Sequence, residues 1–361
     1  MGRAGRQAFE TFGTEPLVGA GTNQLNLKLN ELPRLGNGSV SYLVGAGLSA
    51  GSAFCAPTSK GFFARSFTKH CDGEDREIKL SVDGDAPELA SLLDRLETYY
   101  GPVEELDLED VMSDLHLRAY GIARAWGSMD YSRDSARYIP VLQSDFRLLI
   151  RYVRDRLPCV ETTGKRCPRV TSFAQLIRRQ DSIVTLNYDT ILERHLADCK
   201  ESHHLEYLEL SIEPPGSTYG GSAEPIFRNP RPSAQRGVFT KLHGSKDWYT
   251  CSNPACLNHA YIFPNNPWYP STTSRGKEEG PLLRCSACGS SRMPVIVPPT
   301  PSKSFEDFPK LGFLWSQSYE ALRRAQRWVL IGVSLAATDF HLSSFLSLAD
   351  GPVPWAQGGS R

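Results

Sequence analysis

The stretch SYLVGAGLSAGSAF, from Ser41 to Phe54, places an apolar run directly before a cluster of glycines. The run Val40 to Val44 is short, apolar and partly β-branched, which predicts a buried strand. Gly45, Gly47 and Ala50 then fit the pattern G-x-G-x-x-A. In that pattern the small residues let backbone N–H groups approach a pyrophosphate at the start of the next helix. The alternative is a tight strand-to-helix turn that holds no ligand.

The bulk composition describes an ordinary globular protein. The 361 residues are enough for one large domain or two ordinary ones, and the 40 basic and 40 acidic residues cancel. No segment has the apolar core of a signal peptide or the ~20 apolar residues of a membrane span. The basic residues Arg323, Arg324 and Arg327 are best interpreted as a solvated helix face. We therefore expect a cytoplasmic protein with no membrane contact and no direct nucleic-acid partner.

Hydrophobic periodicity divides the chain into helical and strand regions. Residues 1–37 are polar and rich in turn residues, and we expect an N-terminal arm. Residues 60–157 contain several amphipathic stretches and predict a helical insertion. One of these, DAPELASLLDRLETYY, begins with Asp85 and Glu88 spaced as a capping box.

Continuous apolar runs, typical of strands buried on both faces, return after residue 180. They cover 182–186, 238–242, 295–297 and 328–333, and a helix is predicted over 314–326. Strands alternating with helices predict an α/β fold with a doubly wound parallel sheet. The stretch 212–237 is rich in Pro, Gly and Ser and predicts a long loop.

Four of the nine cysteines form two closely spaced pairs. Cys251 and Cys256 are separated by four residues, and Cys285 and Cys288 by two. Four thiolates arranged in two short-spaced pairs are typical of a structural tetrahedral zinc site. We therefore predict a small zinc-ribbon module over 245–292, with His259 as a less favoured substitute ligand.

Polar residues follow three of the predicted strands, where α/β sheets hold their ligands. Asn187 and Asp189 follow the strand 182–186, His243 follows 238–242, and Ser334 follows 328–333. Each has an ordinary alternative: Asp189 as a helix cap, His243 as a buried core histidine, and Ser334 as a turn residue. The second strand and acidic residue of a classical dehydrogenase are missing after the glycine loop, which counts against that class.

The order of motifs GAGLS, LNYD, KLHG, paired cysteines, PVIVP and GVSL resembles the Sir2 (sirtuin) superfamily over about residues 38–348. The similarity is to its bacterial SIR2-like branch, of the NAD-consuming anti-phage defence type, whose insertion the phrase LDLEDVMSDL also resembles. The resemblance implies a Rossmann-like NAD-binding domain over 38–244 and 293–350, followed by a tail over 351–361.

Carried over residue by residue, the resemblance implies an NAD⁺ site and a structural zinc. Asn187 and Asp189 would face the nicotinamide ribose and carboxamide, and His243 would lie beside the ribose hydroxyls. The cofactor-binding residues it implies are Gly45, Ala46, Gly47, Ser49, Gly332 and Ser334. The cysteine pairs match the structural zinc module of the family, although the first pair is spaced by four residues instead of two.

The departures from the family concern the peptide half of the site. Where sirtuin deacylases carry Pro-Asp-Phe-Arg after the glycine loop, this chain reads FCAPTSKGFF. Where they carry the peptide-clamping strand, it reads VIVPP over 295–299, and a proline removes a donor from a strand-addition clamp.

We therefore expect an NAD⁺ hydrolase, with the same residues serving if the product were cyclised. The alternatives are an NAD-dependent protein deacylase and a non-catalytic nucleotide-binding sensor or scaffold. We also expect homo-oligomerisation or a separate partner protein, such as an ATPase or nuclease.

Overall fold

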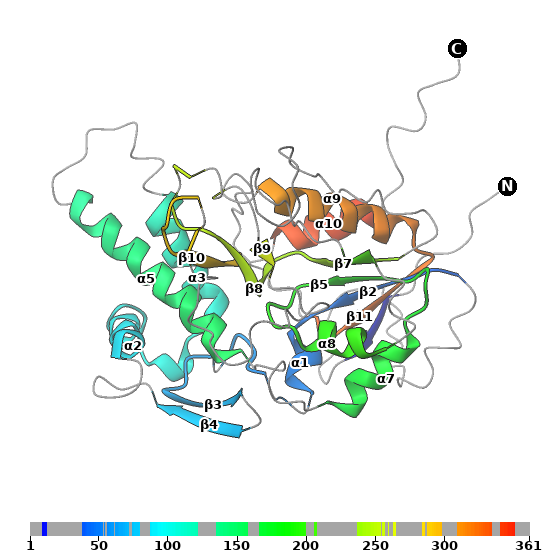
Figure 1. Cartoon of the computed structure of the whole chain (residues 1–361), viewed down its shortest axis with the longest axis horizontal. Helices are drawn as coiled ribbons and strands as arrows, with labels where there is room; N and C mark the ends of the chain where they lie inside the picture. Colours follow the sequence, from blue (N-terminus) through cyan, green and yellow to red (C-terminus); the bar gives the residue numbers. More distant parts are fainter. Residues whose placement is uncertain are drawn as a thin grey trace, which may run out of the picture.

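The computed structural model (Figure 1) describes most of the chain between residues 38 and 350, together with one short N-terminal segment. The described residues are 9–12, 38–52, 54, 56–60, 62–71, 74–79, 87–121, 135–157, 166–199, 206–207, 237–253, 255–256, 259, 263–264, 284–285, 287–297, 309–333 and 340–350. Residues 212–236 of the predicted loop, Ser334, Asp85 of the expected capping box and the tail 351–361 lie outside them.

A six-stranded sheet forms the centre of the molecule, with its strands in the order β1-β11-β2-β5-β7-β6. Every pair of neighbouring strands is parallel. The strands are β1 (Phe9–Phe12), β2 (Val40–Val44), β5 (Ser182–Thr185), β6 (Glu206–Tyr207), β7 (Val238–Lys241) and β11 (Arg327–Ile331). The strands expected over 40–44, 182–186, 238–242 and 328–333 are thus confirmed. Strand β1 was not expected, because residues 1–37 were interpreted as an arm.

Helices cover both faces of this sheet (Figure 1). The alternate residues Val40, Tyr42 and Val44 of β2 share one core with α7 and α8, whereas Leu43 joins a second core with α9 and α10. The helices are α7 (Pro168–Leu176), α8 (Ile191–Asp198), α9 (Pro309–Arg324) and α10 (Phe340–Asp350). A sheet buried on both sides explains why its strands are continuous apolar runs.

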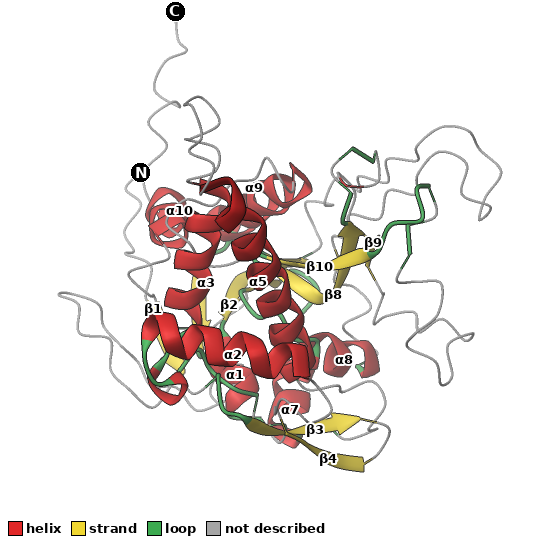
Figure 2. Ribbon diagram, turned by 90° about the vertical axis from the view of Figure 1, so that its left-hand side faces the viewer, coloured by secondary structure: helices red, strands yellow, loops and turns green. Residues whose placement is uncertain are grey.

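A helical module follows β2 in the chain and lies in front of the sheet in Figure 2. It packs α2, α3 and α5 around a core of its own, which includes Phe63, Leu93, Met112 and Leu149. The helices are α2 (Pro87–Tyr100), η2 (Val103–Glu105), α3 (Leu108–His116), the π-helical turn η3 (Leu117–Gly121) and α5 (Ser135–Arg156).

The expectation that 60–157 is simply helical needs a correction. Strands β3 (Ser66–Cys71) and β4 (Glu74–Lys79) pair as an antiparallel hairpin within it. Their sequences are largely polar, so they carry no apolar alternation that predicts a strand.

A small antiparallel sheet carries the cysteines, with its strands in the order β10-β8-β9. They are β8 (Gly244–Cys251), β9 (Phe263–Pro264) and β10 (Arg292–Ile296). The run 295–297 was expected in the parallel sheet, but β10 pairs with β8, so this sheet extends beyond residue 292. The run is continuously apolar because Val295 and Val297 pack beneath α9 while Ile296 packs on the helical module. No described helix is long and apolar enough to cross a membrane.

Candidate functional site

The strand order reverses at β2. The chain runs from β2 to β5 on one side and later returns to β11 on the other side. In open parallel sheets, ligands bind outside the carboxyl ends of the strands at such a reversal. The glycine loop follows β2 at this point, and Gly332 follows β11.

The two loops touch through their backbones. The N–H groups of Gly45 and Gly47 donate to the carbonyl oxygens of Ile331 and Gly332, each over 2.9 Å. A Cβ on Gly47 would lie 2.6 Å from the Gly332 Cα, and Gly332 itself has a φ of +60°. The glycines therefore allow the close approach of two strand ends. Because both N–H groups are used within the protein, a pyrophosphate here would have to be held by other groups.

Helix α1 (Ala46–Ala50) carries the remaining loop residues. Ala46 and Gly47 are exposed, whereas Ser49 is buried. The loop thus presents a small, open backbone surface above a buried hydroxyl.

Asn187 is held directly beneath this loop. Its Nδ2 atom donates to Ser49 Oγ over 3.0 Å, and its backbone N–H donates to Thr185 Oγ1 over 3.1 Å. The side chain is buried, yet Asn187 Oδ1 has no hydrogen-bond partner among the residues that the structure describes. Whichever way the amide is turned, one polar end stays unpartnered, and such a buried group is costly unless something binds it.

His243 lies at the corresponding position of the next strand. Thr185 of β5 and Lys241 of β7 are in register, and Asn187 and His243 each follow two residues later. His243 is buried, and its ring lies between Tyr188 and Trp315, with centroids 6.3 Å away on both sides. The parallel register therefore brings the Asn187 and His243 segments to the same edge of the sheet.

Asp189 is buried, and its Oδ1 accepts a hydrogen bond from the Ile191 N–H over 2.9 Å. This bond satisfies the first backbone N–H of α8 from one residue before the N-cap position, which is Thr190. A contact with a nicotinamide carboxamide stays a prediction.

A buried ion pair that the sequence did not predict lies beside these residues. Lys241 Nζ lies 2.5 Å from Glu193 Oε1 and also donates to the Asp189 carbonyl oxygen over 2.6 Å. Burial raises the pKa of Glu193, and the Lys241 charge opposes that shift. The available signal was a lysine inside the predicted buried strand VFTKL.

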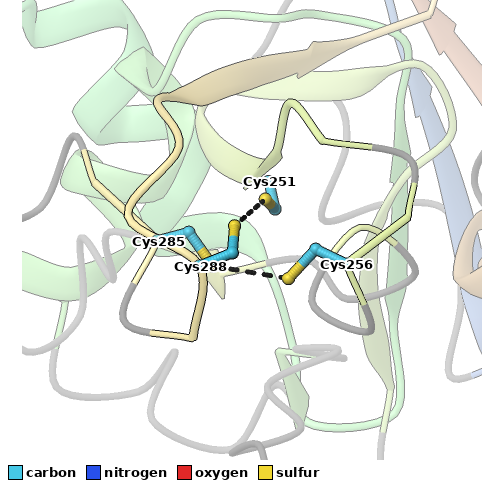
Figure 3. Close-up of side chains that lie close together, drawn as sticks. All are labelled: Cys251, Cys256, Cys285 and Cys288. Atoms are coloured by element: carbon cyan, nitrogen blue, oxygen red, sulfur yellow. Dashed lines mark hydrogen bonds between the residues drawn. The ribbon is translucent and has the colours of Figure 1, made fainter.

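The four paired cysteines converge at the end of β8 (Figure 3). Their sulfur atoms all lie within 4.8 Å of one another. The Sγ atoms of Cys251 and Cys288 are 3.5 Å apart, and those of Cys256 and Cys285 are 3.8 Å apart. Zn–S bonds of about 2.3 Å in a tetrahedron place sulfurs roughly 3.8 Å apart, so the arrangement fits zinc.

The thiols differ in acidity. Burial raises the pKa of Cys251 to about 12, and hydrogen bonds with Ser290 lower the pKa of Cys288 to about 6. A bound cation would replace the Cys251 proton, so metal binding should release protons. His259 Nδ1 lies 2.7 Å from the Cys251 carbonyl oxygen. This ring nitrogen therefore contacts the backbone of the module.

Comparisons with known proteins add little to this geometry. No protein-family model matches the chain, and no curated protein matches it. Among solved structures, the chain is similar to that of Sir2Tm bound to a propionylated peptide, at 13% identity. The match covers 90% of this chain and 84% of that chain, with a TM-score of 0.31. A similarity with so low a TM-score and sequence identity is evidence for neither a fold nor a function.

Proposed function

We propose that this protein hydrolyses NAD⁺ at the nicotinamide–ribose bond and releases nicotinamide and ADP-ribose. The choice of NAD⁺ rests on the motif resemblance to the Sir2 superfamily. The observation that carries the proposal is the buried Asn187 amide, fixed to Ser49 of the glycine loop with its other end unpartnered. A ribose hydroxyl or an attacking water supplies the missing partner.

The proposed reaction breaks the C–N bond, and its electron pair leaves with the nicotinamide nitrogen. The ribose carbon develops oxocarbenium character and forms a bond to the oxygen of water, which loses a proton. His243 accepts that proton or fixes the ribose, Asn187 orients ribose or water, and Asp189 meets the carboxamide. The net reaction adds one water and releases one proton, and no covalent enzyme intermediate is needed.

The hydrogen bonding around Val297 supports water, and not an acyl-lysine peptide, as the attacking group. The Val297 N–H donates to the His243 carbonyl over 2.9 Å, and the Tyr188 hydroxyl donates to the Val297 carbonyl over 2.9 Å. Both polar backbone groups of Val297 are thus used inside the protein. A peptide that adds as a strand needs such groups free.

The opposite edge of β10 is also poorly suited to strand addition. Alternate residues of an antiparallel strand direct their backbone groups to opposite sides. Since Val297 faces β8, the preceding Ile296 faces the outer edge, and the pairing with β8 shifts register between Val295 and Pro294. Pro294, and Pro298 further along the chain, have no N–H to donate.

In the proposed holoprotein, zinc has no part in the reaction. Cys251, Cys256, Cys285 and Cys288 supply four sulfur ligands, which leaves no open coordination position for a substrate. The ion would stabilise the small sheet that carries β10.

The experiment is to incubate the purified protein with NAD⁺, with and without an acetylated peptide, and to identify the products by mass spectrometry. The proposal expects nicotinamide and ADP-ribose in equal amounts without peptide. Products that require the peptide would indicate a deacylase, a cyclic product would change the second step, and unchanged NAD⁺ would favour a sensor or scaffold.

We extend the proposal to a role in anti-phage defence, as a homo-oligomer or with a partner protein such as an ATPase or nuclease. This extension rests on the resemblance alone. Light scattering after size exclusion tests the oligomer, and a fully active monomer would contradict it.

A further inference from the structure

Lys241 and Glu193 form a buried pair that the proposed reaction does not use. Each side chain is 1% exposed, and Lys241 Nζ lies 2.5 Å from Glu193 Oε1. Removing two charges from water has a desolvation cost that can exceed the attraction between them. A buried ion pair is therefore weak evidence for stability. The presence of the pair therefore needs an explanation other than stability.

The second bond of Lys241 points to that explanation. Its Nζ donates to the backbone carbonyl of Asp189 over 2.6 Å, two residues after Asn187. A charged donor makes a shorter and stronger hydrogen bond than a neutral one. The loop between β5 and α8 is thus clamped at its far end by the strand that precedes His243.

The near end of the same loop has clamps of its own. Asn187 is tied to Thr185 through its backbone and to Ser49 through its side chain, and the Leu186 N–H donates to the Val44 carbonyl over 2.8 Å. The middle of the loop is held as well, because the Lys246 N–H donates to the Tyr188 carbonyl over 2.8 Å and the Ile191 N–H donates to Asp189 Oδ1 over 2.9 Å. The bond from Lys241 fixes the Asp189 carbonyl, and with it the peptide unit that leads into α8.

We propose that Lys241 is a positioning residue, whose bond to the Asp189 carbonyl holds the Asn187 loop in line with His243. Glu193 neutralises the ammonium that makes this bond. The inference rests on the proposed function, since it names the residue that aligns the two groups of that same site. Misalignment of reacting groups by about 1 Å can cost about 100-fold in rate.

The test replaces the pair by apolar side chains, in the double variant Lys241→Met with Glu193→Leu. Apolar replacement of a buried ion pair is often tolerated, whereas removing one partner alone leaves a buried charge. We expect kcat for NAD⁺ to fall about 10- to 100-fold with KM nearly unchanged, and the melting temperature to stay close to wild type.

Arg178→Met is the matched control. Arg178 pairs with the buried Asp181 at the opposite end of the same sheet, where the strands begin. This variant should lower the melting temperature and leave kcat unchanged.

Two further measurements separate positioning from folding. Hydrogen exchange of the amides of residues 187–190 should be faster in the double variant than in wild type or Arg178→Met, and this readout needs no activity. Glu193→Gln, which keeps the bond between Lys241 and Asp189, should lose less kcat than the double variant.

The outcomes for the proposed function and for the positioning role of Lys241 can be told apart. Wild-type protein that leaves NAD⁺ intact contradicts the proposed function, and the exchange measurement still tests the clamp. If wild type is active, wild-type kcat in the double variant overturns the positioning role. A double variant that does not fold leaves the decision to Glu193→Gln, and a loss there as steep as in Asn187→Ala overturns it as well.

Discussion

Replacing Gly332 by alanine tests the contact between the glycine loop and the end of β11. Gly332 has a φ of +60°, and a Cβ there would lie 2.4 Å from the Leu48 nitrogen and 2.6 Å from the Gly47 Cα. Both atoms belong to the backbone, so no side chain can move aside. The variant must shift either the glycine loop or the end of the strand.

Two costs add up in this variant. The left-handed backbone conformation costs a residue with a Cβ roughly 1–2 kcal/mol. Forcing an extra methyl group into a packed site costs about 1–3 kcal/mol more. The total of about 2–5 kcal/mol corresponds to a fall in melting temperature of roughly 4–20 °C, at about 2–4 °C per kcal/mol. Because the shift also disturbs Ser49 and Asn187, NAD⁺ turnover should fall with it.

Two other glycines provide matched controls. Gly101 has a φ of +97° and nothing within 4 Å of a built Cβ, so Gly101→Ala should show the conformational cost alone. Gly312 lies in α9 with equally open space, and Gly312→Ala should stabilise the protein by about 0.5–1 kcal/mol. Thermal melts of the three variants are the assay. If Gly332→Ala melts like Gly101→Ala, the close approach does not require a glycine, and the reasoning is refuted.

Three further predictions concern the zinc, the pH dependence and the closed edge. Elemental analysis should find about one zinc per chain, and Cys285→Ser should lose it and melt lower; normal folding without metal would contradict the site. Burial lowers the pKa of His195, so its contribution to stability should be present above pH about 6.5 and be lost as the pH falls below that value. In His195→Gln, the free energy of unfolding should fall less steeply as the pH is lowered below about 6.5. An unchanged slope would show that other groups cause the pH dependence. Tyr188→Phe should cost about 0.5–1.5 kcal/mol by leaving the Val297 carbonyl without its donor, yet confer no turnover of an acetylated peptide; new deacylation would contradict the edge argument.

The four central strands of the sheet, β11, β2, β5 and β7, were predictable because each leaves a local trace in the sequence. Val40 to Val44 and the run ending at Thr185 are short apolar segments that end on small or polar residues, and both are strands. The placement of Asn187 and His243 at one edge of the sheet followed from the rule that parallel strands share one carboxyl edge.

Elements without such a trace were missed. The hairpin of β3 and β4 is largely polar, and β1 has only four residues within a region rich in turn residues. The run 295–297 was assigned to the wrong sheet, because two separate cores bury its two faces and give it the pattern of a central parallel strand.

The chemistry of single side chains also depends on distant partners. Lys241 meets Glu193 from another element, 48 residues away in the chain. Such a pairing has no periodicity that a sequence could display. The unpartnered end of Asn187 is likewise visible only when Ser49 is in place.

The most direct test of the central claim compares NAD⁺ consumption and thermal melting for wild type, Asn187→Ala and His243→Ala. If the two side chains carry the cleavage, each variant should fold, keep its zinc and lose turnover by about 10²–10⁴. The double variant should be little worse than either single variant, because residues that act on one transition state fail as a unit. Variants that melt lower but consume NAD⁺ at nearly the wild-type rate per folded molecule would contradict the account.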